Sequence, residues 1–364
     1  MAPFVLRGRT VKTSVWVSLA MLAATGCAHV GPRTVAVDRF DYSTAIAESW
    51  KQQTLLNIVK TRYVDFPVFV EVSSIVSGYS MQTGVNLGGT LSLEAVPGTF
   101  AAVGGQAIYT DRPTVTYVPM TGEKFLRGLI TPIDPKNVFF LLQTGYAADF
   151  ILGMSVESLN GVRNLSTAGG MAREADPEFL RVLQLLREIQ ATGAFGMRVE
   201  EDKEKGSTGV VFFRRGDVAP EVAAKSAEIR RLLQLPEEPE KFTLAYSPAR
   251  GTGNELAVNS RSMLQIMGAF ASYLDVPEAH LKDRSAVPAL ENASSESAQQ
   301  KVRIHSGKEK PASAYATVHY RDHWFWVEDS DWQTKRALTA VMFFFTLAET
   351  GSQEKLPLIT IPAQ

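Results

Sequence analysis

The segment that decides the fold is Ala337–Leu347, which reads ALTAVMFFFTL. It is apolar on nearly every face of a helix and contains the run Phe343-Phe344-Phe345. This segment is far shorter than the roughly 20 apolar residues that a membrane-spanning helix needs. A helix that is apolar all round is instead covered by the elements around it. We therefore predict a buried C-terminal helix over Asp331–Ala348.

A β-hairpin is predicted just before this helix. Ala314–Tyr320 and Trp324–Val327 are rich in β-branched and aromatic residues, and the polar turn Arg321-Asp322-His323 separates them. Further upstream, short extended segments alternate with helices, and one of these helices is opened by Asp176-Pro177. This pattern predicts an α+β fold, in which a mostly antiparallel sheet packs against helices.

The first helix of the folded region is expected to begin near Asp41 or Ser43, either of which can serve as its N-cap. Its apolar residues recur at helical spacing from Ile46 to Val59. The preceding segment, Ala28–Asp41, contains Gly31 and Pro32 and shows no helical pattern. We therefore expect an extended tether ahead of the first helix.

A glycine-rich segment follows over 73–119. Apolar residues from Val85 to Leu93 alternate with small or polar ones, Pro97-Gly98 supplies a turn, and Thr99–Tyr109 is a second extended segment without charge. We predict a Gly-rich β-hairpin over 83–109, with strands of about 11 residues, the length of a tilted strand that crosses a bilayer. Two interpretations remain open. The hairpin either belongs to the folded domain or is contributed by each subunit to an oligomeric pore.

The N-terminus has the layout of a secretory signal. Arg7, Arg9 and Lys12 are its only charged residues, and an apolar or small segment follows over 13–24. This segment is too short for a spanning helix, so we expect cleavage rather than a permanent transmembrane anchor.

The sequence Ala24-Thr25-Gly26-Cys27 resembles the lipobox of bacterial lipoproteins, with alanine in place of the usual leucine. The resemblance implies cleavage before Cys27 and attachment of lipid to this cysteine. It also implies an outer-membrane destination, because Ala28 rather than aspartate follows. Cys27 is the only cysteine in the chain, so it cannot form an intramolecular disulfide. A lipid anchor gives this lone thiol a role, since each buried methylene contributes roughly 0.8 kcal/mol.

The mature region is similar to uncharacterised exported bacterial lipoproteins. These share a segment like Ala45-Ile46-Ala47-Glu48-Ser49, a downstream Trp-Phe hairpin and a terminal apolar helix, and the resemblance implies no activity. The expected organisation is a signal peptide (1–26), a lipidated tether (27–41), an α+β region (42–277) with the Gly-rich hairpin at about 73–119, a linker or long loop (278–300), and a C-terminal hairpin, helix and strand (301–364) packed on the main domain.

Composition and motifs indicate no catalytic site. Loss of the signal peptide removes three of the 37 Lys and Arg residues and none of the 38 Asp and Glu residues, which leaves a formal charge of -4. No basic excess remains for nucleic acid. His319 and His323 lie on a strand and a turn, where their side chains need not converge on a metal. We therefore expect no catalytic residue, no metal, no cofactor and no nucleic-acid partner.

Three aromatic residues, Tyr320, Trp324 and Trp326, are candidates for binding a partner, although cross-strand pairing within the fold is the common alternative. The leading hypothesis is a non-enzymatic protein with a structural, assembly or binding role. In this hypothesis the lipid anchors the protein in the outer membrane, and its folded domain lies in the periplasm. Its partner would be an envelope protein or another copy of the chain. The first alternative is a subunit of an oligomeric outer-membrane pore built from the 83–109 hairpin. The second is a periplasmic hydrolase.

Overall fold

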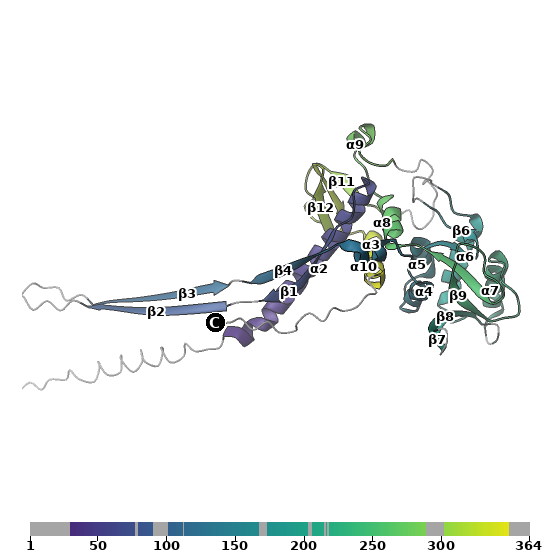
Figure 1. Cartoon of the computed structure of the whole chain (residues 1–364), viewed down its shortest axis with the longest axis horizontal. Helices are drawn as coiled ribbons and strands as arrows, with labels where there is room; N and C mark the ends of the chain where they lie inside the picture. The colour runs from purple at the N-terminus through teal and green to yellow at the C-terminus, as the bar shows by residue number, and fades with distance from the viewer. Residues whose placement is uncertain are drawn as a thin grey trace, which may run out of the picture. The chain divides into compact units, whose positions relative to one another are not determined.

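The computed structural model describes residues 30–76, 79–89, 101–111, 113–166, 173–202, 206–214, 216, 218–288 and 302–348. The fold is α+β with mostly antiparallel sheets, which confirms the predicted fold class (Figure 1). The signal peptide and lipobox up to Cys27, the turn at Pro97-Gly98 and the strand expected near the C-terminus lie outside the described residues. Within the described part of the chain, every helix is too short or too polar to span a membrane.

The elements occur in a mixed order along the chain. The helices are α2 (Val30–Arg62), α3 (Gly122–Ile130), α4 (Pro135–Gln143), α5 (Ala148–Ser155), α6 (Pro177–Gln190), α7 (Pro220–Leu232), α8 (Met263–Ala271), α9 (Glu278–Lys282) and α10 (Trp332–Ala348). The strands are β1 (Phe69–Val76), β2 (Tyr79–Gly89), β3 (Ala101–Asp111), β4 (Thr114–Met120), β5 (Val156–Leu159), β6 (Val162–Arg163), β7 (Phe195–Asp202), β8 (Gly206–Phe213), β9 (Lys241–Tyr246), β10 (Glu255–Ser260), β11 (His305–Gly307), β12 (Ala316–Tyr320) and β13 (His323–Val327).

The chain forms two compact units, Met1–Ala47 with Val72–Tyr117, and Glu48–Glu71 with Val118–Gln364. The first unit contains the predicted hairpin, in which β2 and β3 pair antiparallel over 11 residues each. The hairpin begins at Tyr79, before the start that we predicted at Thr83. Residues 90–93, where the first strand was expected to continue, lie outside the described part, as do the expected turn over 94–98 and the first two residues of the second strand.

A six-stranded sheet organises the second unit, in the order β6-β5-β10-β9-β8-β7. Among the described strands of this sheet, only the β9–β10 pair is parallel. The sequence also predicts two short strands, Met197–Glu200 and Val210–Arg214, on either side of a charged turn. This hairpin is present as β7 and β8. The sequence predicts a mainly helical segment over 121–193, so strands β5 and β6 within it were not predicted. β5 has only four residues, which is too few to show a period of two.

The C-terminal helix is buried, as its composition predicted. Seven of its side chains are buried, namely those of Thr334, Ala337, Leu338, Ala340, Val341, Phe344 and Phe345. The Phe345 ring lies 4.4 Å from the Phe69 ring and 5.3 Å from the Trp50 ring, between ring centroids. The helix is not covered all round, because Phe343 is 44% exposed. One broad face of α10 therefore contributes to the core of this unit.

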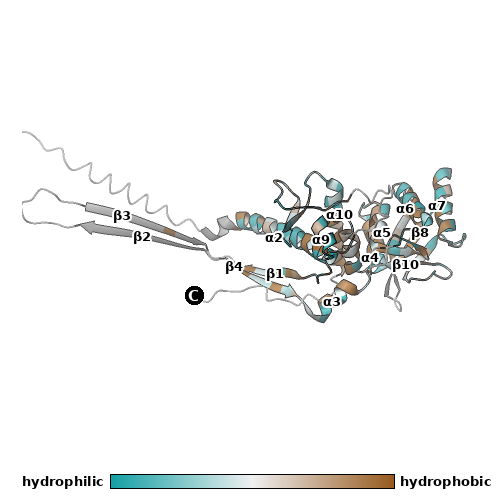
Figure 2. Ribbon diagram, turned by 90° about the horizontal axis from the view of Figure 1, so that it is seen from above, coloured by the Kyte–Doolittle hydropathy of each residue, from teal (hydrophilic) through white to brown (hydrophobic). Residues whose placement is uncertain are grey.

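Helix α2 starts earlier than the sequence predicts. The helix begins at Val30 rather than near Asp41 or Ser43, so most of the expected extended tether is helical. Pro32 is compatible with this start because proline is tolerated in the first turn of a helix. Side chains from Val35 to Ser49 are exposed or half-buried, and Figure 2 shows much of α2 as hydrophilic. An exposed stretch needs no apolar face, so it lacks the periodicity that would have revealed it.

The second part of α2 belongs to the second unit and is buried there. Leu55, Ile58 and Val59 are fully buried. Two side-chain amides on the same helix bind the start of β1. The amide of Gln53 exchanges hydrogen bonds of 2.8 and 3.1 Å with the backbone of Val70, and that of Asn57 makes bonds of 2.8 and 2.9 Å with the backbone of Val68. These bonds satisfy backbone groups that a neighbouring strand would otherwise pair.

The expected linker over 278–300 begins with a short helix, α9, and its later part lies outside the described residues. The backbone N–H of Val287 donates to the carbonyl oxygen of Arg62 at 3.0 Å. The first residues of this segment are therefore attached to the end of α2.

Candidate functional site

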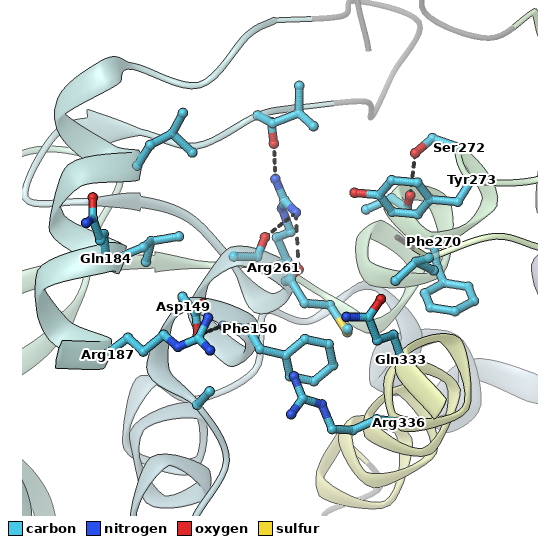
Figure 3. Close-up of a pocket in the computed structure, with 18 of the residues that line it drawn as sticks. Asp149, Phe150, Gln184, Arg187, Arg261, Phe270, Ser272, Tyr273, Gln333 and Arg336 are labelled. Atoms are coloured by element: carbon cyan, nitrogen blue, oxygen red, sulfur yellow. Dashed lines mark hydrogen bonds and ion pairs between the residues drawn. The ribbon is translucent and has the colours of Figure 1, made fainter. Parts of the chain in front are cut away.

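A cavity of about 560 Å³ lies in the second unit, between α5, α6, α8 and the first turns of α10 (Figure 3). Most of its wall is apolar or aromatic. The apolar and aromatic lining residues are Ala147, Phe150, Gly153, Met154, Leu165, Leu180, Leu183, Ala269, Phe270, Val302 and Trp332. Cavities of this size and character are typical of sites for small organic molecules.

Helix geometry explains how α6 and α10 face the cavity. Leu180, Leu183 and Arg187 are three or four residues apart on α6, so they share one face of that helix. Gln333 and Arg336 have the same relation at the start of α10. Helix α6 therefore directs both apolar and polar side chains toward the cavity, and α10 adds two polar ones.

Arg261 holds the wall of the cavity together. Its side chain is only 6% exposed, and its Nε donates to Oε2 of Glu157 at 3.0 Å. Its Nη1 donates to the carbonyl oxygen of Met154 at 3.1 Å, and its Nη2 donates to that of Leu165. Burial lowers the pKa of Arg261, and the carboxylate of Glu157 opposes this shift. Because its donors are already engaged, we assign Arg261 a structural role.

Arg336 is different, because its guanidinium stacks on aromatic rings. The guanidinium carbon lies 4.5 Å from the ring centroid of Phe150 and 5.4 Å from that of Trp332. Its Nε is buried and has no hydrogen-bond partner in the described part of the chain. Stacking uses the face of a guanidinium and leaves the in-plane N–H groups able to donate. Among the described residues, Arg336 makes neither a hydrogen bond nor an ion pair.

The other charged groups of the cavity are paired. Nη1 of Arg187 lies 2.8 Å from Oδ2 of Asp149, and Figure 3 shows this pair beside Phe150, with Arg336 on the other side of the ring. The hydroxyl end of Tyr273 points toward Arg261 in the same view. Burial raises the pKa of Tyr273, with Arg261 opposing the shift, so the hydroxyl stays protonated at neutral pH and can donate a hydrogen bond.

The three aromatic residues that we proposed for partner binding do not line this cavity. Trp324 lies against its cross-strand neighbour His319, with ring centroids 5.0 Å apart. Trp326 stacks on His305 at 5.6 Å, and the hydroxyl of Tyr320 donates to Asp65. Each therefore has a partner within the fold, as expected for cross-strand aromatic residues.

Tyr320 belongs to a polar aromatic cluster at the end of α2. The Tyr63 hydroxyl and Nδ1 of His280 are 2.8 Å apart, and the His280 and His323 rings are 4.8 Å apart. Burial is the largest cause that raises the pKa of Tyr63 to about 12. Burial, followed by the nearby His323, lowers the pKa of His280. The cluster therefore keeps both partners neutral near pH 7, which suits a hydrogen bond that joins α2 to α9.

Little in the sequence indicated the cavity. Its lining comes from segments as far apart as Ala147 and Arg336, and their side chains converge only after folding. A local signal was present at Leu180, an apolar residue of α6 that remains 39% exposed. An exposed apolar side chain beside the buried stripe of an amphipathic helix is consistent with a contact outside the main core.

The described part of the chain contains no group of three or more His, Cys, Asp or Glu residues placed to hold a metal ion. Comparisons with protein-family models, with curated proteins and with solved structures found no match. The fold and the cavity define an α+β protein with a helix-walled cavity of a size that suits a small molecule.

Proposed function

We propose that this protein is a lipid-anchored outer-membrane protein with its folded region in the periplasm. In this proposal its role is non-enzymatic, and it binds a small ligand in the cavity between α5, α6, α8 and α10. The observation that carries the binding role is the lining of the cavity, which combines apolar walls with a few polar groups. Such lining provides burial for the body of a ligand and specific contacts that fix its orientation.

The anchoring part of the proposal is supported by the signal-like N-terminus and by the lone Cys27 in its lipobox. The exposed part of α2, from Val35 to Ser49, suits a solvent-facing spacer between an anchor and a folded domain. A helical spacer advances about 1.5 Å per residue, less than half the reach of an extended tether.

Replacing Cys27 by serine should release the protein from the membrane fraction, because serine lacks the thiol to which the lipobox assigns the lipid. Mass spectrometry of the wild-type N-terminus should show a lipid-modified Cys27, and fractionation should place the Cys27→Ser chain among soluble proteins. A wild-type chain that is cut elsewhere, carries no lipid and is soluble would contradict the proposal.

Ligand binding can be tested with the neutral fluorescent probe N-phenyl-1-naphthylamine and the mature Cys27→Ser chain, which avoids lipid and detergent. We expect saturable binding, because the cavity offers an apolar wall. Gln184→Trp should weaken this binding by at least about tenfold, equivalent to roughly 1.4 kcal/mol, because the indole would fill space beside α6.

Glu188→Trp is the matched control for that experiment. Glu188 is an exposed residue on the same helix and does not line the cavity, so the variant should bind the probe as the parent chain does. Non-saturable binding to the parent chain would contradict the proposed cavity site. Equal binding by the two tryptophan variants would place the bound probe elsewhere.

The length of the hairpin supports a second candidate, a subunit of an oligomeric outer-membrane pore. β2 and β3 each have 11 residues, which is long enough for a tilted strand to cross a bilayer. Several copies would have to associate, since the edges of one hairpin cannot be left unpaired in lipid. Native mass spectrometry of detergent-extracted protein separates the candidates. Rings would support the pore, and monomers would exclude it.

A further inference from the structure

We infer that the cavity selects an amphipathic anion, a molecule with an apolar body and one acidic head group that Arg336 binds. This inference rests on the proposed ligand-binding role of the cavity. A carboxylate, a sulfonate and a phosphate ester would all bind in the same way, because each offers negatively charged oxygens to a guanidinium.

Arg336 has an unsatisfied hydrogen-bond donor. Its Nε is buried without an acceptor, and among the described residues its guanidinium has no ion-pair partner. A buried donor without a partner is destabilising, and more so when it is charged. An acidic oxygen in the plane of this guanidinium would satisfy the donor and would leave the stacking on Phe150 and Trp332 intact.

The charges around the cavity favour an anion over a cation. Asp149 is the only acidic residue in the described lining, and it is already paired with Arg187. Arg261 is paired with Glu157 and donates to backbone carbonyls. Arg336 therefore carries the one charge of the described lining without a counter-charge, and that charge is positive. A cationic ligand would meet this charge with no free carboxylate in the described lining to bind it.

The rest of the wall selects an apolar body for the same ligand. Met154, Leu183, Phe270 and Val302 contribute apolar surface that a small inorganic anion would leave uncovered. Burial of apolar surface on binding is favourable, so the body of an amphipathic ligand adds affinity that a free phosphate ion lacks. The combination of this wall with Arg336 points to an amphiphile rather than to a bare anion.

Two probes that share one aromatic skeleton test the inference. N-Phenyl-1-naphthylamine is neutral, and 8-anilinonaphthalene-1-sulfonate adds a single sulfonate to the same skeleton. With the mature Cys27→Ser chain, the anionic probe should bind at least about tenfold more tightly than the neutral probe. A hydrogen bond to a charged group strengthens binding by about that factor or more. This comparison needs no change in the cavity.

Arg336→Met should weaken binding of the anionic probe by about 10- to 100-fold and change binding of the neutral probe by less than about threefold. Methionine keeps an unbranched apolar side chain but has no N–H donor. Lys335→Met is the matched control, because it removes a neighbouring positive charge from the same helix. Lys335 pairs with Asp329 and does not line the cavity, so this variant should retain the preference for the anionic probe.

The outcomes separate this inference from the proposed function. Saturable binding of the neutral probe with no preference for the sulfonate would overturn the inference and leave the binding role standing. An equal loss of both probes in a folded Arg336→Met chain would also overturn it. If neither probe binds the parent chain, the proposed binding role itself fails. Inorganic phosphate that competes as strongly as an acidic amphiphile would contradict the selection for an apolar body.

Discussion

Phe344→Ala should lower the free energy of unfolding by about 3 to 5 kcal/mol, because it removes an aromatic ring from the centre of the core. Phe344 is fully buried on α10. Truncation of such a side chain loses the transfer free energy of the ring and leaves a cavity that its neighbours fill only in part. Urea denaturation followed by circular dichroism would measure the change, as a shift in midpoint at constant slope.

The adjacent residue provides a matched control on the same helix. Phe343 is 44% exposed, so Phe343→Ala removes the same atoms from a site that water already contacts. Its effect should be about 1 kcal/mol or less, since exposed positions contribute little. Equal losses of stability in the two variants would show that α10 does not bury the face that carries Phe344.

The difference between Phe343 and Phe344 also shows what the sequence could establish. The run of apolar residues in α10 predicted a buried helix, and the β-branched and aromatic residues on either side of a polar turn predicted the hairpin β12–β13. Both signals are local, because each depends only on the composition of neighbouring residues. The apolar run could not show which phenylalanine faces outward, because that depends on the elements that cover the helix.

The features that sequence analysis missed depend on distant parts of the chain. β5 is a strand because β10 pairs with it, with Val258 opposite Leu159, and its four residues alone have no distinctive pattern. The first half of α2 has no core-facing apolar stripe, so no periodicity indicated a helix there. Gly31 and Pro32 also argued against a helix, although α2 starts at Val30. The cavity was missed because, like β5, it depends on distant segments. Arg336 and Phe150 approach each other only in the folded chain.

The pair of Arg261 and Glu157 is the other place where a single change should have a large effect. Arg261 is buried, and Glu157 is its only acidic partner among the described residues. The same carboxylate also pairs with Arg173 at 2.9 Å, but the Arg173 side chain is 39% exposed. Glu157 therefore pairs with one buried arginine and one partly exposed arginine. The contributions of these two ion pairs to stability can be compared.

Glu157→Ala should lower the free energy of unfolding by about 3 to 5 kcal/mol, because it leaves the buried guanidinium of Arg261 without a counter-charge. Arg173→Met, which removes the other partner of Glu157, should change it by about 1 kcal/mol or less, because partly exposed ion pairs contribute little. Urea denaturation of both variants gives the comparison. Losses that differ by less than about 1 kcal/mol would contradict the role assigned to Arg261.

The same variant links stability to the cavity. Arg261 donates to the carbonyl oxygens of Met154 and Leu165, two residues that line the cavity, so a displaced guanidinium would release both wall segments. Under conditions where Glu157→Ala remains folded, it should bind the neutral probe more weakly than Arg173→Met does, because a loosened wall must be ordered again on binding. Equal probe affinities in the two variants would mean that the wall keeps its shape without the ion pair.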